Sequence, residues 1–184
     1  KSISTADLRA QFDESAIVDV RSAYEFQTLH IKGASHISLY DDDFASKVRA
    51  LQQRTGKLVV FYCNGRTCYK SYKAADKARA KGVTNVAAYD AGIFDWAQGN
   101  PNLAVLLGED LRDASRLLSK QQFKDRLLSP DAFADMVAAD ETPMVMDIRS
   151  RKQRRSVGLF VFKEEHIPLD QSAKMDAYVE KAKA

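Results

Sequence analysis

The stretch Lys57–Tyr69, KLVVFYCNGRTCY, decides how this chain folds. Its first half is a continuous run of β-favouring apolar residues that stops at Cys63, as is typical of a strand buried on both faces of a parallel sheet. Its second half, Asn64–Cys68, is a short connection that contains one glycine. The spacing then predicts a helix over Tyr69–Lys81, which Gly82 ends. A strand, a tight turn and a helix in this order predict an α/β fold.

The segments on either side continue this alternation. Ala16–Val20 and Asn85–Tyr89 are short apolar runs that predict further buried strands. A helix is expected to begin at Ser4 or Thr5, whose hydroxyl groups suit an N-cap, and another is expected over Phe44–Thr55. Strands and helices at this spacing imply right-handed parallel crossovers.

Composition excludes several classes of protein. Of the 184 residues, 45% are hydrophobic and 29% are charged, which is typical of a soluble globular protein and not of a disordered one. The net charge of +3 is mild and the basic residues are spread among carboxylates, so we expect no nucleic-acid partner. No apolar stretch approaches the roughly 20 residues that span a bilayer, so we expect no membrane insertion. The chain begins at Lys1 instead of Met. We therefore expect that an upstream segment was removed; a bacterial periplasm or cytoplasm fits, and a removed leader would favour the periplasm.

Cys63 is the candidate nucleophile. It stands at the carboxyl end of the central predicted strand, where ligands bind in open parallel sheets. Loop N–H groups and the dipole of the next helix would gather positive potential there, and Arg66 adds a formal charge. These features predict a pKa for Cys63 below its free value of about 8.5. An inert core thiol is the alternative, and the pattern alone does not choose between sulfur transfer, phosphate-ester chemistry and disulfide exchange.

The Cys63 loop is similar to the active-site loop of the rhodanese family, and the segments before and after it resemble the opening and closing signatures of that family, in the same order along the chain. One strand ends in Asp-x-Arg with a Glu after it, a stretch similar to Gly-His-Ile-x-Gly-Ala leads to Asn-Ile-Pro-Leu, and a closing segment is similar to Gly-Gly-x-x-x-Trp. They are Ile17–Phe26, Leu29–Leu39 and Ala91–Trp96. The resemblance covers about residues 1 to 105. The departures from the family pattern are Leu29, Lys32 and Ala91, together with Cys68, which stands where relatives often place Arg, Thr or Ser.

The resemblance implies a parallel sheet flanked by helices and a sulfurtransferase mechanism. The Cys63 thiolate would attack the outer sulfur of a small anionic donor such as thiosulfate, release sulfite and hold the sulfur as a persulfide. A thiophilic acceptor, either cyanide or a thiol, would then remove it. This chemistry needs no cofactor and no metal. The residues expected to bind substrate are Asn64, Gly65, Arg66, Thr67, Cys68 and Tyr69.

Other polar residues of the motifs are expected to support the site. Asp19 and Arg21 are a structural pair in the family, tying the strand end to neighbouring loops, and Glu25 and His30 are interpreted in the same way. His36 is expected to pack or to lie on the surface, and Trp96 to belong to the core.

Cys68 leaves an alternative open. With four residues between them, Cys63 and Cys68 can form a disulfide if the loop brings their Cα atoms within about 7 Å. Cys68 would then resolve a persulfide or protect the site by oxidation. Two cysteines without His or Cys companions make neither a disulfide framework nor a zinc site.

An internal repeat follows the first unit, at offsets of 125 to 130 residues. The matching pairs are Asp19–Ser22 with Asp147–Ser150, His36–Leu39 with His166–Leu169, and Ser4–Leu8 with Ser129–Phe133. We therefore expect a rhodanese-like catalytic domain at 1–107, a helical linker at 108–127 and an incomplete repeat at 128–184 that has no cysteine. A half-sheet would leave an unpaired edge, which invites a homodimer or strand exchange.

Three function classes remain in contention. The first is a sulfurtransferase, and the second is a non-enzymatic sulfur carrier or docking module that would form a persulfide without rapid turnover. The third is a thiol redox protein that uses the Cys63–Cys68 pair. An arsenate reductase or phosphatase is weaker, because that chemistry wants a longer loop closed by Arg, and Tyr69 occupies that place.

Overall fold

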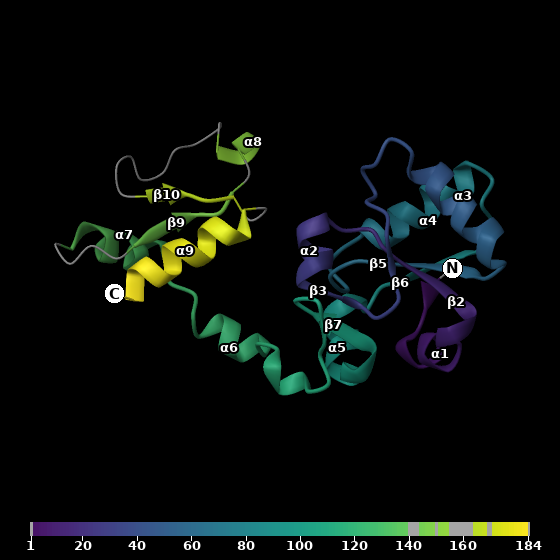
Figure 1. Ribbon diagram of the computed structural model, residues 1–184, viewed down its shortest axis with the longest axis horizontal. Coiled ribbons are helices and arrows are strands. Elements are labelled where there is room, and N and C mark those ends of the chain that lie inside the picture. The colour runs from purple at the N-terminus through teal and green to yellow at the C-terminus, as the bar shows by residue number, and fades with distance from the viewer. Residues whose placement is uncertain (1, 140–143, 150, 155–163, 169–170, 184) are drawn as a thin grey trace. The chain divides into compact units, whose positions relative to one another are not determined.

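The computed structural model describes residues 2–139, 144–149, 151–154, 164–168 and 171–183 (Figure 1). The chain divides into two compact units, Lys1–Leu117 and Leu118–Ala184. The first unit thus includes the residues just beyond 107, where the sequence placed the end of the first domain. Among them Leu111 is fully buried in the core of this unit.

The first unit is built on a parallel sheet of five short strands. Their order across the sheet is β1 (Ser2–Ile3), β6 (Val86–Tyr89), β5 (Leu58–Tyr62), β2 (Ser15–Asp19) and β4 (Ser35–His36). Every neighbouring pair is parallel, and Asp19 at the end of β2 is level with both Tyr62 and His36. The prediction of an α/β fold with a parallel sheet is confirmed.

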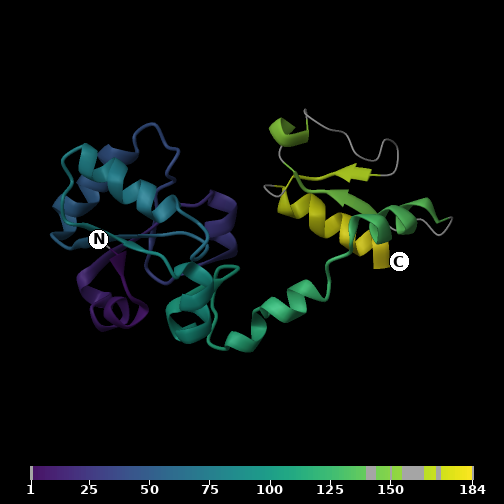
Figure 2. The same cartoon turned by 180° about the vertical axis from the view of Figure 1, so that it is seen from behind.

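Helices cover both faces of this sheet (Figures 1 and 2). One face carries α3 (Phe44–Thr55) and α4 (Lys70–Ala80), and the other carries α1 (Thr5–Ala10) and α5 (Gly92–Gly99). The core divides accordingly, because successive side chains of a strand point to opposite faces. In β5, Val59 and Phe61 pack toward α3 and α4, whereas Val60 and Tyr62 pack toward α1 and α5. Such a strand is apolar on both sides, and this accounts for its continuous apolar sequence.

The predicted helix ends are largely confirmed. Ser4 caps α1, since its hydroxyl accepts the N–H of Asp7 at 3.1 Å. Gly56 ends α3 in the left-handed conformation at φ 66°, which costs a glycine little. The helix expected over Tyr69–Lys81 begins one residue later, with Tyr69 as its N-cap.

A small antiparallel sheet in the same unit escaped sequence analysis. It consists of β3 (Leu29–Ile31), β7 (Ala104–Leu106) and β8 (Glu109–Asp110), and β3 follows directly on α2 (Ala23–Thr28). Strands of two or three residues are too short to show an alternating pattern. Short 3-10 turns complete the unit at Phe12–Glu14, Pro101–Leu103 and Ala114–Arg116.

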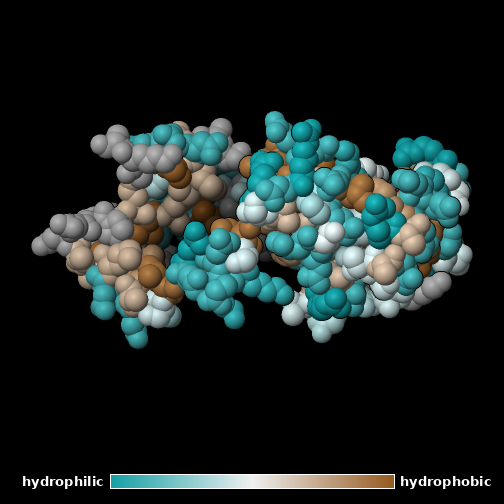
Figure 3. All heavy atoms as spheres, turned by 90° about the horizontal axis from the view of Figure 1, so that it is seen from below, coloured by the Kyte–Doolittle hydropathy of each residue, from teal (hydrophilic) through white to brown (hydrophobic). Residues whose placement is uncertain are grey.

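The second unit contains α6 (Lys120–Lys124), α7 (Pro130–Ala138), β9 (Val145–Asp147), α8 (Arg151–Arg154), β10 (Glu164–His166) and α9 (Ser172–Lys183). Strands β9 and β10 are parallel, and Ser129 caps α7. At the left of Figure 3, next to the atoms drawn in grey, much of the visible surface is apolar. Exposed large apolar residues of this unit include Phe123, Leu127, Leu128 and Met136.

The second unit reproduces one local arrangement of the first. Asp147 is level with His166 across β9 and β10, as Asp19 is with His36 across β2 and β4. The Nε2 atom of His166 lies 2.9 Å from the carbonyl oxygen of Arg149, and that of His36 lies 2.9 Å from the carbonyl oxygen of Arg21. Of the repeat predicted from the sequence, Ser150 and Leu169 lie outside the described residues.

No helix in the described part of the chain has both the length and the apolar character needed to cross a bilayer.

Trp96 should carry much of the stability of the first unit. It lies on α5 and is fully buried in the core, where it stacks on Phe12 at 5.5 Å between ring centroids, and its Nε1 donates to the Leu103 carbonyl at 2.9 Å. We expect Trp96→Ala to lower the free energy of unfolding by about 3–5 kcal/mol, measured by urea titration with far-UV circular dichroism. Phe94→Ala on the same helix is the control. Phe94 is 54% exposed, so its loss should cost about 0.5 kcal/mol or less. Equal losses for the two variants would contradict this account.

Candidate active site

Cys63 is the first residue after β5 and begins the loop that leads into α4. Its side chain is fully buried and belongs to the core beside α3 and α4. Its carbonyl oxygen accepts the N–H of Ile93 at 3.0 Å, so the start of the loop is tied to α5. The cysteine therefore lies at the carboxyl edge of the parallel sheet, as the sequence predicted, but below the surface.

A polar network holds the next residue, Asn64, from two sides. Its Oδ1 accepts from Nη1 of Arg21 at 3.0 Å, and its Nδ2 donates to Oε1 of Glu25 at 2.9 Å. Arg21 is in turn paired with Asp19 at 2.6 Å, with both side chains almost fully buried. Arg21 also donates to the carbonyl oxygen of Leu29. The structure thus brings Asp19, Arg21 and Glu25 together beneath the cysteine loop.

Glu25 is held in its charged form by this arrangement. Burial opposes its ionisation, but hydrogen bonds from Ser22 and Asn64 outweigh that cost and leave the pKa of Glu25 below its ordinary value. Ser22 and Glu25 also form the capping box that begins α2. The same carboxylate therefore fixes both a helix start and the amide of the loop.

The two histidines of the motifs pack beside α2. His30 stacks on Phe26 with ring centroids 4.1 Å apart, and its Nδ1 lies 2.7 Å from the carbonyl oxygen of Phe26. His36 also stacks on Phe26, at 5.2 Å. Their contacts are those of packing residues.

Gly92 allows α5 to touch the backbone of the loop. Its φ is 72°, and a Cβ atom there would lie 2.5 Å from the carbonyl carbon of Asn64 and from the nitrogen of Gly65. Real Cβ atoms do not approach a backbone so closely. The close contact between α5 and the loop therefore explains why the motif Ala91–Trp96 has a glycine at position 92.

The sulfur of Cys63 faces a hydrogen-bond acceptor, the carbonyl oxygen of Cys68. Its thiol donates to the carbonyl oxygen of Cys68 at 2.8 Å, and the hydroxyl oxygen of Ser71 lies 3.9 Å from Sγ. Burial raises the pKa of Cys63, a hydrogen bond with the Cys68 thiol raises it further, and the backbone N–H of Ser71 acts in the opposite direction. The predicted lowering of this pKa is therefore wrong. The reason is that the thiol is buried and meets a carbonyl oxygen instead of a ring of N–H donors.

Cys68 has the lowered pKa that the sequence predicted for Cys63. It is half-buried; burial opposes its ionisation, but a hydrogen bond from the Cys63 thiol and the backbone N–H groups of Lys70 and Asn64 lower its pKa. These donors include the first residue of α4, where the helix dipole favours an anion. The more acidic thiol is therefore the outer one.

The remaining residues predicted to bind substrate form the exposed rim of the loop. Thr67, Tyr69 and Arg66 are exposed, and the guanidinium of Arg66 reaches Asp95 on α5 at 3.4 Å. An anionic donor that approached Arg66 would compete with that carboxylate. Among the residues that the structure describes, no group of three or more His, Cys, Asp or Glu side chains could hold a metal ion.

Sequence reasoning missed Ser71, which is fully buried in the first turn of α4 beside Sγ of Cys63. A hydroxyl on the buried side of a helix that is otherwise rich in Ala and Lys was the available signal. It also missed that Asn64 joins Arg21 to Glu25, because that contact depends on three segments distant in sequence.

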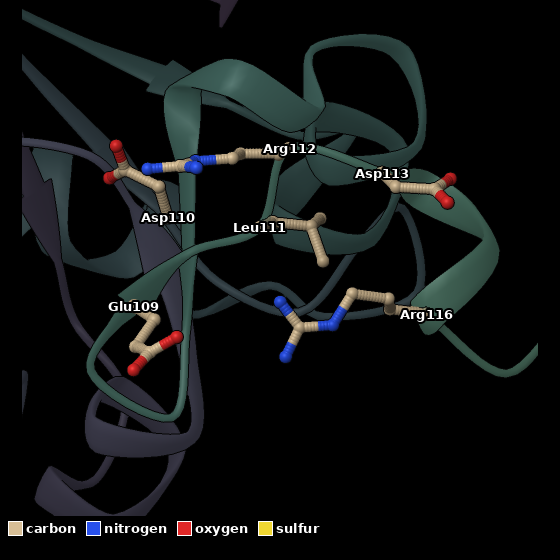
Figure 4. A pocket seen from close by; sticks show the side chains of 6 residues that line it. All are labelled: Glu109, Asp110, Leu111, Arg112, Asp113 and Arg116. Carbon is tan, nitrogen blue, oxygen red and sulfur yellow. The ribbon is translucent and has the colours of Figure 1, made fainter.

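A surface depression elsewhere in the first unit has no nucleophilic side chain. It is lined by Glu109, Asp110, Leu111, Arg112, Asp113 and Arg116 (Figure 4). None of these side chains is a nucleophile, and Asp110 is already paired with Lys32 at 2.7 Å. The cysteine loop is therefore the better candidate for the active site.

A test of the contact between α5 and the loop uses two glycines with positive φ. In Gly56→Ala the new Cβ meets no atom within 4 Å, so we expect only the backbone cost of about 1–2 kcal/mol. In Gly92→Ala the loop backbone must also move, which adds about 1–3 kcal/mol and should slow the reaction of Cys63 with a thiol reagent. Urea titration and alkylation rates measure both effects. Equal behaviour of the two variants would show that the contact is not tight.

The two thiols should differ in their reaction with iodoacetamide. Because the pKa of Cys68 is lowered and that of Cys63 is raised, we expect Cys68 to be alkylated first at pH of about 7. Cys63 should follow only as the pH rises through its own higher pKa. Peptide mass spectrometry over a pH series measures this order. The control is the same series in guanidinium chloride, in which both thiols should react alike. Faster labelling of Cys63 in the folded protein at neutral pH would contradict the assignment.

Comparison with known proteins agrees with this architecture. A solved structure, the BH2092 protein of Bacillus halodurans, has a TM-score of 0.51 and 22% identity, covering 68% of this chain and 89% of that one. The uncharacterized protein YqhL of Bacillus subtilis is 31% identical over 96 residues, which are 52% of this chain and 71% of that protein. The tRNA uridine(34) hydroxylase of Erwinia tasmaniensis is 30% identical over 100 residues but is matched over only 28% of its length. The model of the rhodanese-like domain matches residues 4–99, which include strands β2, β4, β5 and β6 of the parallel sheet, Cys63 and the motif around Gly92, and the chain therefore belongs to the rhodanese-like domain family.

Proposed function

We propose that this protein is a sulfurtransferase that carries sulfane sulfur on Cys63. The sulfur would come from a small anionic donor such as thiosulfate and pass to a thiophilic acceptor, either cyanide or a thiol. The observation that supports this best is a cysteine at the end of the central strand, in a loop fixed by both Arg21 and Gly92. A loop held so firmly suits a reaction in which one sulfur atom is received and released at a fixed place.

The first half-reaction exchanges one sulfur–sulfur bond for another. The Cys63 thiolate attacks the outer sulfur of thiosulfate, the sulfur–sulfur bond of the donor breaks, and sulfite leaves with the bonding electron pair. Arg66 on the exposed rim is suited to attract the donor, because its ion pair with Asp95 is exposed to solvent and therefore weak. The raised pKa of Cys63 means that its proton must be removed during the reaction.

The second half-reaction returns the cysteine to its starting state. A cyanide ion or a thiolate attacks the outer sulfur of the persulfide, and Cys63 leaves as a thiolate. Backbone N–H groups near the start of α4, such as that of Ser71, would stabilise charge on the sulfur. Ping-pong kinetics are expected from this sequence of steps.

We also propose that residues 128–184 form an incomplete second unit of the same kind. The support is the local arrangement of Asp147, Arg149 and His166, which repeats that of Asp19, Arg21 and His36. Residues 128–184 contain no cysteine, so this unit would take no sulfur itself. Its role would be to dock on a partner chain, including a second copy of this one.

A single-turnover experiment tests the proposed function. Reduced protein mixed with thiosulfate and no acceptor should release about one equivalent of sulfite, and Cys63→Ser should release none. With an acceptor present, product should accumulate with ping-pong kinetics. The fold of Cys63→Ser is checked by its circular dichroism and its urea midpoint.

The other outcomes point elsewhere. A sulfite burst with no later turnover for any acceptor would indicate a carrier instead of an enzyme. The absence of a burst in the wild type would refute sulfur transfer from thiosulfate by Cys63. A burst that survives Cys63→Ser and is lost in Cys68→Ser would move the sulfur site to Cys68.

A further inference from the structure

We propose that Cys68 is a second catalytic residue, which resolves the Cys63 persulfide, releases hydrosulfide and leaves a Cys63–Cys68 disulfide. This inference rests on the proposed function, since it requires a persulfide on Cys63. It makes the protein a sulfide-releasing enzyme whose physiological partner is a dithiol reductant, because the disulfide must be reduced before the next cycle.

Contact between the two cysteines is the first support. The thiol of Cys63 donates to the backbone carbonyl of Cys68 at 2.8 Å, so the two residues are in direct contact. Cys68 packs against the same core cluster that contains Cys63. A disulfide therefore needs only that the two sulfurs of this one short loop approach each other, with no movement of distant elements.

The difference in burial between the two sulfurs is the second support. Cys63 is fully buried, whereas Cys68 is half-buried and is flanked in the loop by the exposed Thr67 and Tyr69. An acceptor that comes from solvent therefore meets Cys68 before it meets Cys63. An acceptor within the loop itself has a high effective concentration at the persulfide, which no dissolved thiol can match.

The N–H groups around Cys68 are the third support. The backbone N–H groups of Lys70 and Asn64 point to its sulfur, and α4 begins at Lys70. They lower the pKa of Cys68 while that of Cys63 is raised, so the Cys68 thiolate is the one suited to accept the proton of the neighbouring Cys63 thiol. Cys68 is then the base that makes the buried Cys63 nucleophilic toward the sulfur donor.

The resolving step balances in atoms and charge. The Cys68 sulfur attacks the inner sulfur of the Cys63 persulfide, which is Sγ of Cys63 itself. The bond between the two cysteine sulfurs forms, the bond to the outer sulfur breaks, and the outer sulfur leaves as HS⁻ with the proton that Cys68 had accepted. The sulfane sulfur is reduced to sulfide, and the two cysteine sulfurs are oxidised to the disulfide. A dithiol reductant then restores both thiols.

The experiment is anaerobic and starts from fully reduced protein without added thiol. After addition of thiosulfate, sulfide is assayed, and the intact mass is recorded for wild type, Cys68→Ser and Cys68→Ala. We expect the wild type to release about one equivalent of sulfide and to lose about 2 Da, with a Cys63–Cys68 disulfide found by non-reducing peptide mapping. Addition of a dithiol should then convert the single burst into continuous sulfide release.

Both Cys68 variants should instead retain the sulfur. We expect a gain of about 32 Da on Cys63 and at least a tenfold lower sulfide yield in the absence of added thiol. Ser keeps a hydroxyl in place of the thiol and Ala keeps neither, so equal behaviour of the two assigns the effect to the lost nucleophile. Because removal of the base should slow the sulfur uptake, the variants are followed to completion.

Three results would overturn the inference. If the wild type also keeps 32 Da and releases no sulfide, Cys68 does not resolve the persulfide, although the proposed function stands. If the disulfide forms without sulfide, it arises by ordinary oxidation. If no protein releases sulfite or gains mass, the proposed function fails, and the resolving step fails with it.

Discussion

The buried ion pair between Arg21 and Asp19 is the interaction on which the rest of the first unit depends. Neither side chain is exposed by more than 3%, and a charge in such a place is tolerated only when its hydrogen bonds are satisfied. Arg21 meets this requirement with bonds to the end of β2, to the backbone of β3 and to Asn64 in the cysteine loop. One guanidinium thereby fixes the relative positions of three segments. The loop that bears the Cys63 sulfur is therefore held in place by an almost fully buried charge.

The loop divides two chemical requirements between two cysteines. Protection from solvent favours a stable persulfide but raises the pKa of the buried thiol, so a single residue cannot be both well shielded and readily ionised. Here Cys63 is shielded and Cys68 receives the helix N–H groups. The Cys63 thiol donates to the Cys68 carbonyl oxygen, which keeps the two residues in contact. Considered together, the pair has the properties that sequence analysis sought in one residue.

The sequence predicted the main elements of the fold because their signals are local. The apolar run of β5, the Ser4 cap and Gly56 each act within a few residues, and the structure confirms all three. The small antiparallel sheet was missed because β3 pairs with β7, far along the chain, through strands of three residues. At the site, the position of Cys63 was predictable from the end of a strand. Its pKa was not, because it depends on which group of the loop faces the sulfur.

The alternating packing of β5 has a consequence for the place of the nucleophile. One core contains the side chains of Val59, Phe61 and Cys63, and the other contains those of Val60 and Tyr62. The sulfur therefore lies on the same face of the sheet as the two apolar side chains of Val59 and Phe61. A slip of this strand by one residue would exchange the two sets of side chains and carry the sulfur to the face of α1 and α5. The division of valine and aromatic side chains between the two cores thus determines on which face of the sheet the thiol lies. The position of the Cys63 thiol therefore depends on the hydrophobic pattern of β5 as much as on the motif that surrounds the cysteine.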